Sequence, residues 1–278
     1  MNHFETSWKS TDGIDIFAQG WKPAGKIKVA VCLVHGIGEH TSRYEHVARY
    51  FCDQGFAMMG ADSRGHGRSA GPRGHFHSAE AILNDIDKLL DETRQRFPDL
   101  PLILYGHSLG AIWVLYHSLK RNPDVKGVIA TSPGFHNAIE KQRAKVITVK
   151  IIGSLLPGIL LRSGLDATKL SHNPKVVEDY KNDPMVHDRF SMGLGRIMLA
   201  ISRWTIENAA NFTLPLLMMH GKADAIAFPS GSIDFAKPIK ENIKLVLWDG
   251  AYHELHNEPE KAEVMKMMTG WMDERIKD

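Results

Sequence analysis

The chain has 278 residues, of which 43% are hydrophobic and 24% charged, proportions that are typical of globular proteins and exclude disordered and fibrous classes. This length is compatible with a single domain built from alternating strands and helices. The formal net charge of +2 is too small to indicate nucleic acid as a partner.

The predicted elements begin with an antiparallel pair, in which strands at 4–9 and 14–21 flank the hairpin turn signal Asp12-Gly13. Continuous apolar runs then alternate with segments of helical periodicity, a pattern that predicts a mostly parallel sheet with helices on both faces. The runs expected to form buried strands are 29–34, 56–60, 102–105, 125–130, 214–219 and 243–248. The expected helices lie at about 44–51, 79–97, 109–120 and 259–276.

The strand pattern stops between residues 134 and 211, where helical segments are interrupted by glycine and proline. We interpret this region as an insertion into one α/β core and not as a separate domain. The sequence therefore predicts core segments at 1–133 and 212–278, with a helical cap at 134–211 between them.

Cysteine content and the apolar stretches bear on the location of the protein. Cys32 and Cys52 are too few for a disulfide framework, and both fall in patterns typical of buried reduced thiols. The N-terminal residues lack the pattern of a secretory signal. The most apolar stretch, 146–161, contains Lys150 and Pro157 and is shorter than the ~20 residues that span a bilayer. We expect a cytoplasmic protein without a transmembrane helix, and peripheral contact with a membrane stays open.

The pentapeptide Gly106-His107-Ser108-Leu109-Gly110 has the pattern Gly-x-Ser-x-Gly, which alone is weak evidence for a nucleophile. Its position strengthens the case, because an apolar strand precedes it and an amphipathic helix follows it, as a nucleophile elbow requires. The flanking glycines let strand and helix approach closely, and the helix N-terminus stabilises nearby negative charge. The alternative is an ordinary serine N-cap, and the flanking pattern favours the nucleophile.

A serine hydroxyl needs a base within hydrogen-bond distance to become a nucleophile. In folds with such an elbow, the chain order is serine, then an acid, then histidine, with the acid and the histidine after late strands. Asp224 follows the expected strand 214–219, and His253 follows the expected strand 243–248. Ser108, Asp224 and His253 thus have the expected order along the chain, and each follows an expected strand.

We expect Ser108 to attack an acyl carbonyl, His253 to take its proton, and Asp224 to orient the imidazole. Asp234 is a rival acid, but it lies in a segment that reads as a helix. His256 is a rival base a few residues beyond the favoured one.

The tetrahedral oxygen formed by this attack needs fixed hydrogen-bond donors. We expect one from the backbone N–H of Leu109, directly after the nucleophile, and the other from Ile37, in the loop after strand 29–34. A plain glycine-rich turn is the alternative for that loop.

Several short boxes in register carry a family resemblance over nearly the whole chain. They are His-Gly-Ile-Gly-Glu-His-Thr-Ser-Arg-Tyr at 35–44, Asp-Ser-Arg-Gly-His-Gly-Arg-Ser at 62–69, the elbow at 106–110, Asn-Asp-Pro at 182–184, Gly-Lys-Ala-Asp at 221–224, and Tyr-His-Glu-Leu-His-Asn-Glu at 252–258. Together they resemble the boxes of monoacylglycerol lipases and related lysophospholipases of the α/β-hydrolase superfamily.

The resemblance implies an α/β-hydrolase fold and an esterase or lipase that cleaves single-chain acyl lipids, foremost monoacylglycerol, without a metal or an organic cofactor. It also implies that Glu39, Arg43 and His256 bind the polar head of the substrate, with a salt-bridged structural role as the alternative for the first two. Ala111 departs from the family, which often has a second glycine there.

The cap segment 144–165 is more apolar than one helix face needs. We expect most of these side chains to pack against the core, and some to line an acyl channel or to lie at a membrane surface beside basic residues. The apolar residues are Ile147, Ile151, Ile152, Leu155, Leu156, Ile159, Leu160 and Leu161, and the basic ones are Lys141, Arg143, Lys145, Lys150 and Arg162.

Other functions stay open on this scaffold. A lysophospholipase, or a hydrolase of short esters or aminoacyl substrates, would use the same machinery. A binding protein without activity is disfavoured because all three catalytic positions are intact. Zinc-dependent hydrolysis is also disfavoured. His75 and His77, or His253 and His256, could bind a zinc ion, but no motif supplies a third ligand.

Overall fold

The computed structural model describes residues 1–137 and 143–276, and its main feature is one eight-stranded sheet. The strands are β1 (Asn2–Lys9), β2 (Asp15–Lys22), β3 (Val29–Val34), β4 (Phe56–Ala61), β5 (Leu102–His107), β6 (Gly127–Thr131), β9 (Leu216–Gly221) and β10 (Ile243–Trp248). Their order in the sheet is β1-β2-β4-β3-β5-β6-β9-β10. β2 runs antiparallel to both of its neighbours, and the other strands are parallel, so the predicted fold class is confirmed.

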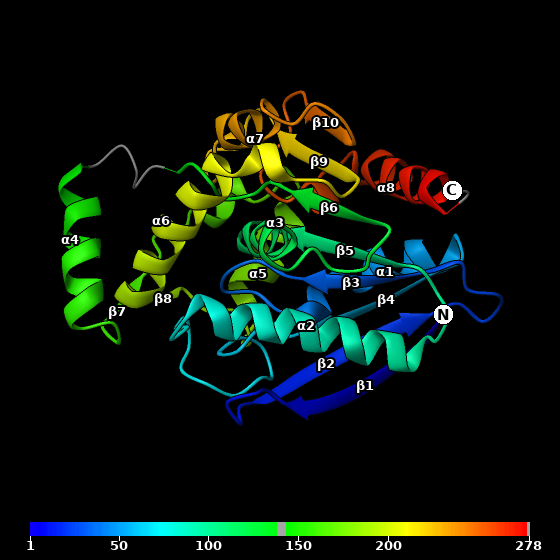
Figure 1. The fold of residues 1–278 in the computed structure, drawn as a ribbon, viewed down its shortest axis with the longest axis horizontal. Helices are drawn as coiled ribbons and strands as arrows, with labels where there is room; N and C mark the ends of the chain where they lie inside the picture. Colours follow the sequence, from blue (N-terminus) through cyan, green and yellow to red (C-terminus); the bar gives the residue numbers. More distant parts are fainter. Residues whose placement is uncertain (138–142, 277–278) are drawn as a thin grey trace.

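Helices cover both faces of this sheet (Figure 1). The covering helices are α1 (Glu45–Asp53), α2 (Ala79–Arg96), α3 (Leu109–Arg121), α7 (Pro229–Ala236) and α8 (Lys261–Arg275). Alternation along β3 explains the two layers: Ala30 and Cys32 point into a core with α2 and α3, whereas Val31 and Leu33 point into a core with α1 and α8. All six residues of β3 are buried, which is why its sequence reads as an unbroken apolar run.

The region between β6 and β9 contains α4 (Arg143–Leu155), β7 (Leu160–Arg162), α5 (Pro174–Asn182), β8 (Arg189–Ser191) and α6 (Met192–Glu207). We expected helices alone, and the two strands, which pair antiparallel as a second small sheet, are a correction. Strands of three residues are too short to show an alternating pattern in the sequence. Figure 1 shows α4 at the far end of the molecule from the sheet, packed beside α6.

The prediction that most apolar side chains of segment 144–165 pack against the core is wrong. Ile152 is partly buried, but seven others are between 41% and 74% exposed. We call these seven the cap apolar surface: Ile147, Ile151, Leu155, Leu156, Ile159, Leu160 and Leu161. Ile147, Ile151 and Leu155 lie on α4, which packs mainly against α6 and leaves these side chains in solvent, and the other four lie between the end of α4 and β7 or in β7 itself.

Other expectations on this region and on the chain as a whole have mixed outcomes. Lys141 lies outside the described residues, as do the side chains of Arg143 and Lys145. Cys32 and Cys52 are buried and unpaired, as predicted. Among the described helices, none has the length and apolarity needed to cross a bilayer.

Replacing Leu33 by alanine is expected to lower the free energy of unfolding by about 2–5 kcal/mol, because it leaves a cavity in the core beneath α1. Ile147→Ala is the control, since this side chain is 57% exposed, and its effect should stay within about 0.5 kcal/mol. Urea unfolding followed by circular dichroism measures both. An equal loss at Ile147 would contradict the exposed position of α4.

Candidate active site

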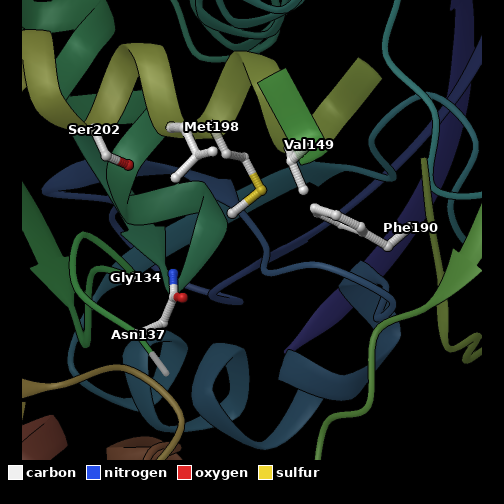
Figure 2. Close-up of a pocket in the computed structure, with 8 residues that line it drawn as sticks. Gly134, Asn137, Val149, Phe190, Met198 and Ser202 are labelled. Atoms are coloured by element: carbon white, nitrogen blue, oxygen red, sulfur yellow. The ribbon is translucent and has the colours of Figure 1, made fainter. Parts of the chain in front are cut away.

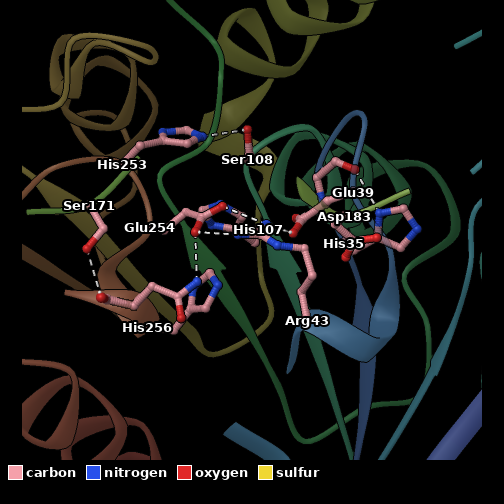
Figure 3. A network of polar contacts seen from close by, with 12 residues as sticks. His35, Glu39, Arg43, His107, Ser108, Ser171, Asp183, His253, Glu254 and His256 are labelled. Carbon is pink, nitrogen blue, oxygen red and sulfur yellow. Dashed lines mark hydrogen bonds and ion pairs between the residues drawn. The ribbon is translucent and has the colours of Figure 1, made fainter. Parts of the chain in front are cut away.

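Three loops at the carboxyl edge of the sheet bring Ser108, His253 and Asp224 together. Figure 3 shows the ring of His253 directed at Ser108. His253 Nε2 lies 2.9 Å from Ser108 Oγ, and His253 Nδ1 lies 2.7 Å from Asp224 Oδ2. Ser108 occupies the sharp turn between β5 and α3 with a φ of 53°, a conformation that is strained for a residue with a side chain. Such strain at a turn that presents a hydroxyl is typical of a nucleophile elbow.

The rival residues lie elsewhere. Asp234 is on α7 with a 52% exposed side chain, and its carboxylate is 3.8 Å from a ring nitrogen of His136. His256 is fully buried, and its ring stacks on that of Tyr44 at 4.7 Å between centroids. The hydrogen bond to Ser108 comes from His253 instead.

The loop that carries Ile37 lies directly against the elbow. A Cβ atom on Gly110 would collide with the carbonyl oxygens of Val34 and His35, so only glycine allows this close approach. Leu109 is the first residue of α3, and its N–H has no partner within the helix. Both predicted oxyanion donors therefore belong to segments adjacent to the nucleophile.

Electrostatics favour a charged Asp224 beside a basic His253. Burial acts to lower the pKa of His253, but the Asp224 carboxylate outweighs it, and the pKa is raised above its usual value. Burial acts to raise the pKa of Asp224, but His253 and His220 hold it well below its usual range. His107, 5.0 Å from His253 between ring centroids, stays neutral because burial lowers its pKa to about 3.

Asp224 is held by four N–H donors. Its Oδ1 accepts from the backbone N–H groups of Ile226 and Ala227, both at 2.9 Å. Its Oδ2 lies near His253 and also 3.1 Å from Nε2 of His220. Sequence reasoning missed His220, although its position at the end of a strand, four residues before the expected acid, is a usable signal.

Two of the residues expected to bind the polar head of the substrate, Glu39 and Arg43, belong to a salt-bridged network, and the third, His256, is buried near it (Figure 3). Arg43 donates to Glu39 at 2.6 Å and to both carboxylate oxygens of Glu254, at 2.7 and 2.9 Å. Glu39 is 3% exposed and His256 is 0% exposed. The salt-bridged alternative for Glu39 and Arg43 is the arrangement found, and binding of the substrate head by Glu39, Arg43 and His256 stays a prediction.

The network joins the loops of the site to one another. Glu39 accepts the backbone N–H of Gly36 at 2.6 Å, which fixes the loop beside the nucleophile. Glu254 directly follows His253, so the same guanidinium of Arg43 also holds the histidine loop. Glu254 lies in the box 252–258, directly after the expected base, but no role of its own was predicted for it from the sequence.

The region between β6 and β9 touches the same loops. Nε2 of His40 lies 2.8 Å from Oδ2 of Asp183, and the backbone N–H of His187 donates to the carbonyl of Gly38 at 2.9 Å. The backbone N–H of Glu254 donates to Leu170 at 2.8 Å.

An apolar cavity lies between α4, β8, α6 and the loop after β6 (Figure 2). Gly134, whose N–H is 3.4 Å from the Ser108 carbonyl oxygen, forms part of its wall. Figure 2 shows Val149, Phe190 and Met198 pointing toward one another across it. The full lining is Gly134, Asn137, Val149, Phe190, Gly195, Met198, Leu199 and Ser202.

Among the described residues, no three histidine, cysteine or acidic side chains lie close enough together to hold a metal ion, and His75 instead contacts Ser191.

The mostly parallel sheet and the serine, histidine and carboxylate at its edge define a serine hydrolase of the α/β-hydrolase fold. The chain belongs to the family described as serine aminopeptidase S33, whose model matches residues 25–260.

Individual relatives agree with this assignment. A monoacylglycerol lipase of Mycolicibacterium smegmatis is 33% identical over 270 residues, which cover 96% of each chain. The solved structure of a monoacylglycerol lipase from Paleococcus ferrophilus has a TM-score of 0.82 at 30% identity, covering 99% of this chain and 100% of that one. An uncharacterized abhydrolase domain-containing protein of Dictyostelium discoideum is 37% identical over 93% of this chain, which spans 28% of that protein. The predicted family resemblance is confirmed.

The pH dependence of kcat/KM on a short ester should show an acid limb above pH 6.5. His253 accepts a proton only when neutral, and a raised pKa keeps it protonated to higher pH, so activity falls as the pH drops through that value. Asp224→Asn removes the charge that raises this pKa, so the limb should move to lower pH while kcat falls by about 10⁴.

Asp234→Asn is the matched control for this experiment, because it makes the same substitution at the rival, exposed acid. Its profile should coincide with that of the unmodified protein. Equal losses in the two variants would contradict the assignment of Asp224.

Proposed function

We propose that the protein is a carboxylic ester hydrolase that cleaves single-chain acyl lipids, with monoacylglycerol as its preferred substrate. The observation that carries the proposal is the aligned Ser108, His253 and Asp224, together with an apolar cavity whose wall includes Gly134, a residue in backbone contact with Ser108. A fatty acyl chain in that cavity would place its carbonyl carbon at Ser108.

The proposed reaction proceeds through an acyl-enzyme. Because Asp224 accepts from Nδ1–H of His253, the Nε2 lone pair faces Ser108 and takes its proton as Oγ attacks the carbonyl. The N–H groups of Ile37 and Leu109 stabilise the oxyanion. The C–O bond to the alcohol breaks as His253 returns the proton to the leaving oxygen, and water then hydrolyses the acyl-enzyme by the reverse path.

The character of the cavity supports an acyl chain over an aminoacyl group. Val149, Phe190, Met198 and Leu199 supply apolar surface, and each methylene buried there stabilises the complex by about 0.8 kcal/mol. None of the described residues that line the cavity carries a charge, so it offers no carboxylate for the ammonium group of an aminoacyl substrate. The monoacylglycerol lipases of M. smegmatis and P. ferrophilus support glycerol as the alcohol.

We also propose that residues 134–211 act as a cap over core segments 1–133 and 212–278, and that the cap apolar surface contacts lipid assemblies. Large contiguous apolar patches are uncommon on soluble monomers and mark interaction sites. Lys150 and Arg162 lie in the same segment as exposed cations, as expected for a surface that meets lipid head groups. The surface would bring the enzyme to membranes that contain its substrate.

Hydrolysis of a long-chain monoacylglycerol, a matched lysophospholipid, a short ester and an aminoacyl amide, measured as the acid released from each, tests the substrate class. We expect the monoacylglycerol to have the highest kcat/KM and Ser108→Ala to abolish release from every substrate. Preference for the lysophospholipid would keep the mechanism and change the substrate. Preference for the short ester or the amide, or release that persists in Ser108→Ala, would contradict the proposal.

Leu155→Asp, alone or with Ile151→Asp, should weaken binding to phosphatidylglycerol-containing vesicles and lower activity on vesicle-borne monoacylglycerol, because it places charge in the cap apolar surface. Activity on a dissolved short ester should stay unchanged. Ile233→Asp is the matched control, since Ile233 is 43% exposed on α7, outside that surface. Unchanged vesicle sedimentation in the cap variants would refute the lipid contact.

A further inference from the structure

A second histidine contacts the proposed acid of the site. His220 is the penultimate residue of β9 and is fully buried. Its Nε2 lies 3.1 Å from Oδ2 of Asp224, the same oxygen that contacts His253, and 2.9 Å from the carbonyl oxygen of Ala227. Its Nδ1 lies 2.7 Å from Oγ of Ser232, a fully buried residue of α7.

These partners fix which nitrogen donates. The carbonyl of Ala227 only accepts, so Nε2 of His220 carries a hydrogen and shares it between that carbonyl and Asp224. In the neutral ring Nδ1 then accepts from the Ser232 hydroxyl, and in a charged ring it donates to it. The donor to Asp224 is the same in both cases.

We propose that His220, held by Ser232, is a positioning residue that keeps Oδ2 of Asp224 directed at His253. The inference rests on the proposed function, since it assigns a role within that reaction. His220 acts through Asp224, because its hydrogen-bond partners are Asp224, Ala227 and Ser232 and do not include Ser108.

The burial of His220 supports this role. A polar ring in a fully buried position costs stability unless its nitrogens are hydrogen-bonded, and both nitrogens of His220 have partners. The neighbouring Gly221 packs so tightly that a Cβ atom would collide with the carbonyl oxygens of Ala251 and Tyr252, in the loop that leads to His253. A displaced Asp224 would therefore disturb the base directly.

The hydrogen bond also bears on basicity. A donor to a carboxylate stabilises its charged form, so His220 contributes to the lowered pKa of Asp224. A less basic carboxylate attracts the proton of the neighbouring imidazolium less strongly. His220 therefore limits how far Asp224 raises the pKa of His253.

The other charged groups that face the base lie on different loops and are unaffected by changes at His220. Glu254 and Glu39 both act to raise the pKa of His253, and the neutral ring of His107 lies beneath it. Asp224 itself faces His253 and His220. A shift in the pH profile of a His220 variant thus reports on the bond to Asp224.

Two substitutions at His220 distinguish loss of the hydrogen bond to Asp224 from a change in side-chain packing. His220→Gln places an amide N–H near the position of Nε2 and keeps the donor to Asp224, whereas His220→Asn places its amide near Nδ1 and leaves Asp224 without that donor. We expect His220→Asn to lower kcat on a short ester by about ten- to a hundredfold with KM unchanged. Its acid limb should move to higher pH, because a more basic Asp224 raises the pKa of His253 further.

His220→Gln should retain kcat within about threefold, with the acid limb in place. Ser232→Ala removes the support of the ring without changing His220 and should give a smaller loss with a shift in the same direction. It also serves as the second variant if His220→Asn does not fold, which circular dichroism and the melting temperature establish. The rate at which a fluorophosphonate labels Ser108 gives an independent readout of nucleophile activation and should follow kcat.

The outcomes are distinct from those that test the proposed function. If the unmodified protein shows no Ser108-dependent ester hydrolysis, the proposed function fails. If it is active, the role of His220 is overturned by an acid limb that stays in place in both His220→Asn and Ser232→Ala, or by equal loss in His220→Gln and His220→Asn.

Discussion

The geometry around Ser108 depends on the two ion pairs that the buried guanidinium of Arg43 forms with Glu39 and Glu254. Glu39 holds the loop beside the nucleophile, and Glu254 follows His253. Removing these charges from water costs several kcal/mol per ion, and only well-aligned partners offset that cost. The bidentate contact with Glu254 and the further hydrogen bonds of Glu39 satisfy the network, so its arrangement is specific and tolerates little displacement.

Two buried neighbours of His253 differ in charge, since His107 is neutral and Asp224 is ionised. The same low-polarity surroundings that keep His107 neutral would also favour a neutral carboxyl at Asp224, yet four N–H donors, one of them on the imidazole of His253, keep that carboxylate charged. An anion and a neutral ring thus lie on either side of one histidine. This contrast gives His253 the raised pKa of a base while its neighbours do not compete for the proton.

The fold and the three proposed catalytic residues could be predicted because both depend on where the buried strands lie in the sequence and on which residues follow them. Parallel strands buried on both faces read as apolar runs, and the residues just after them meet at one edge of the sheet. That rule located Ser108, Asp224 and His253 without any knowledge of side-chain contacts. It does not extend to contacts between loops, which depend on how side chains from distant segments fill a shared volume. Arg43 and His256 were therefore placed by family resemblance alone, and resemblance did not reveal that they are buried.

The exposed side chains of α4 escaped prediction for a related reason. Apolar residues in a helix indicate burial only when a partner surface exists, and the sequence does not specify that α4 packs mainly against α6.

The proposed cap makes polar contacts near the site and exposes apolar side chains elsewhere. Near the site, His40 with Asp183 and Gly38 with His187 tie residues after α5 to the loop that carries Ile37. The cap is therefore polar and anchored where it meets the site, and apolar and weakly packed where it faces away. In the proposed lipid contact, a lipid surface would engage the second part and leave the loops around Ser108 in place, so the proposed binding and the proposed reaction involve different parts of this region.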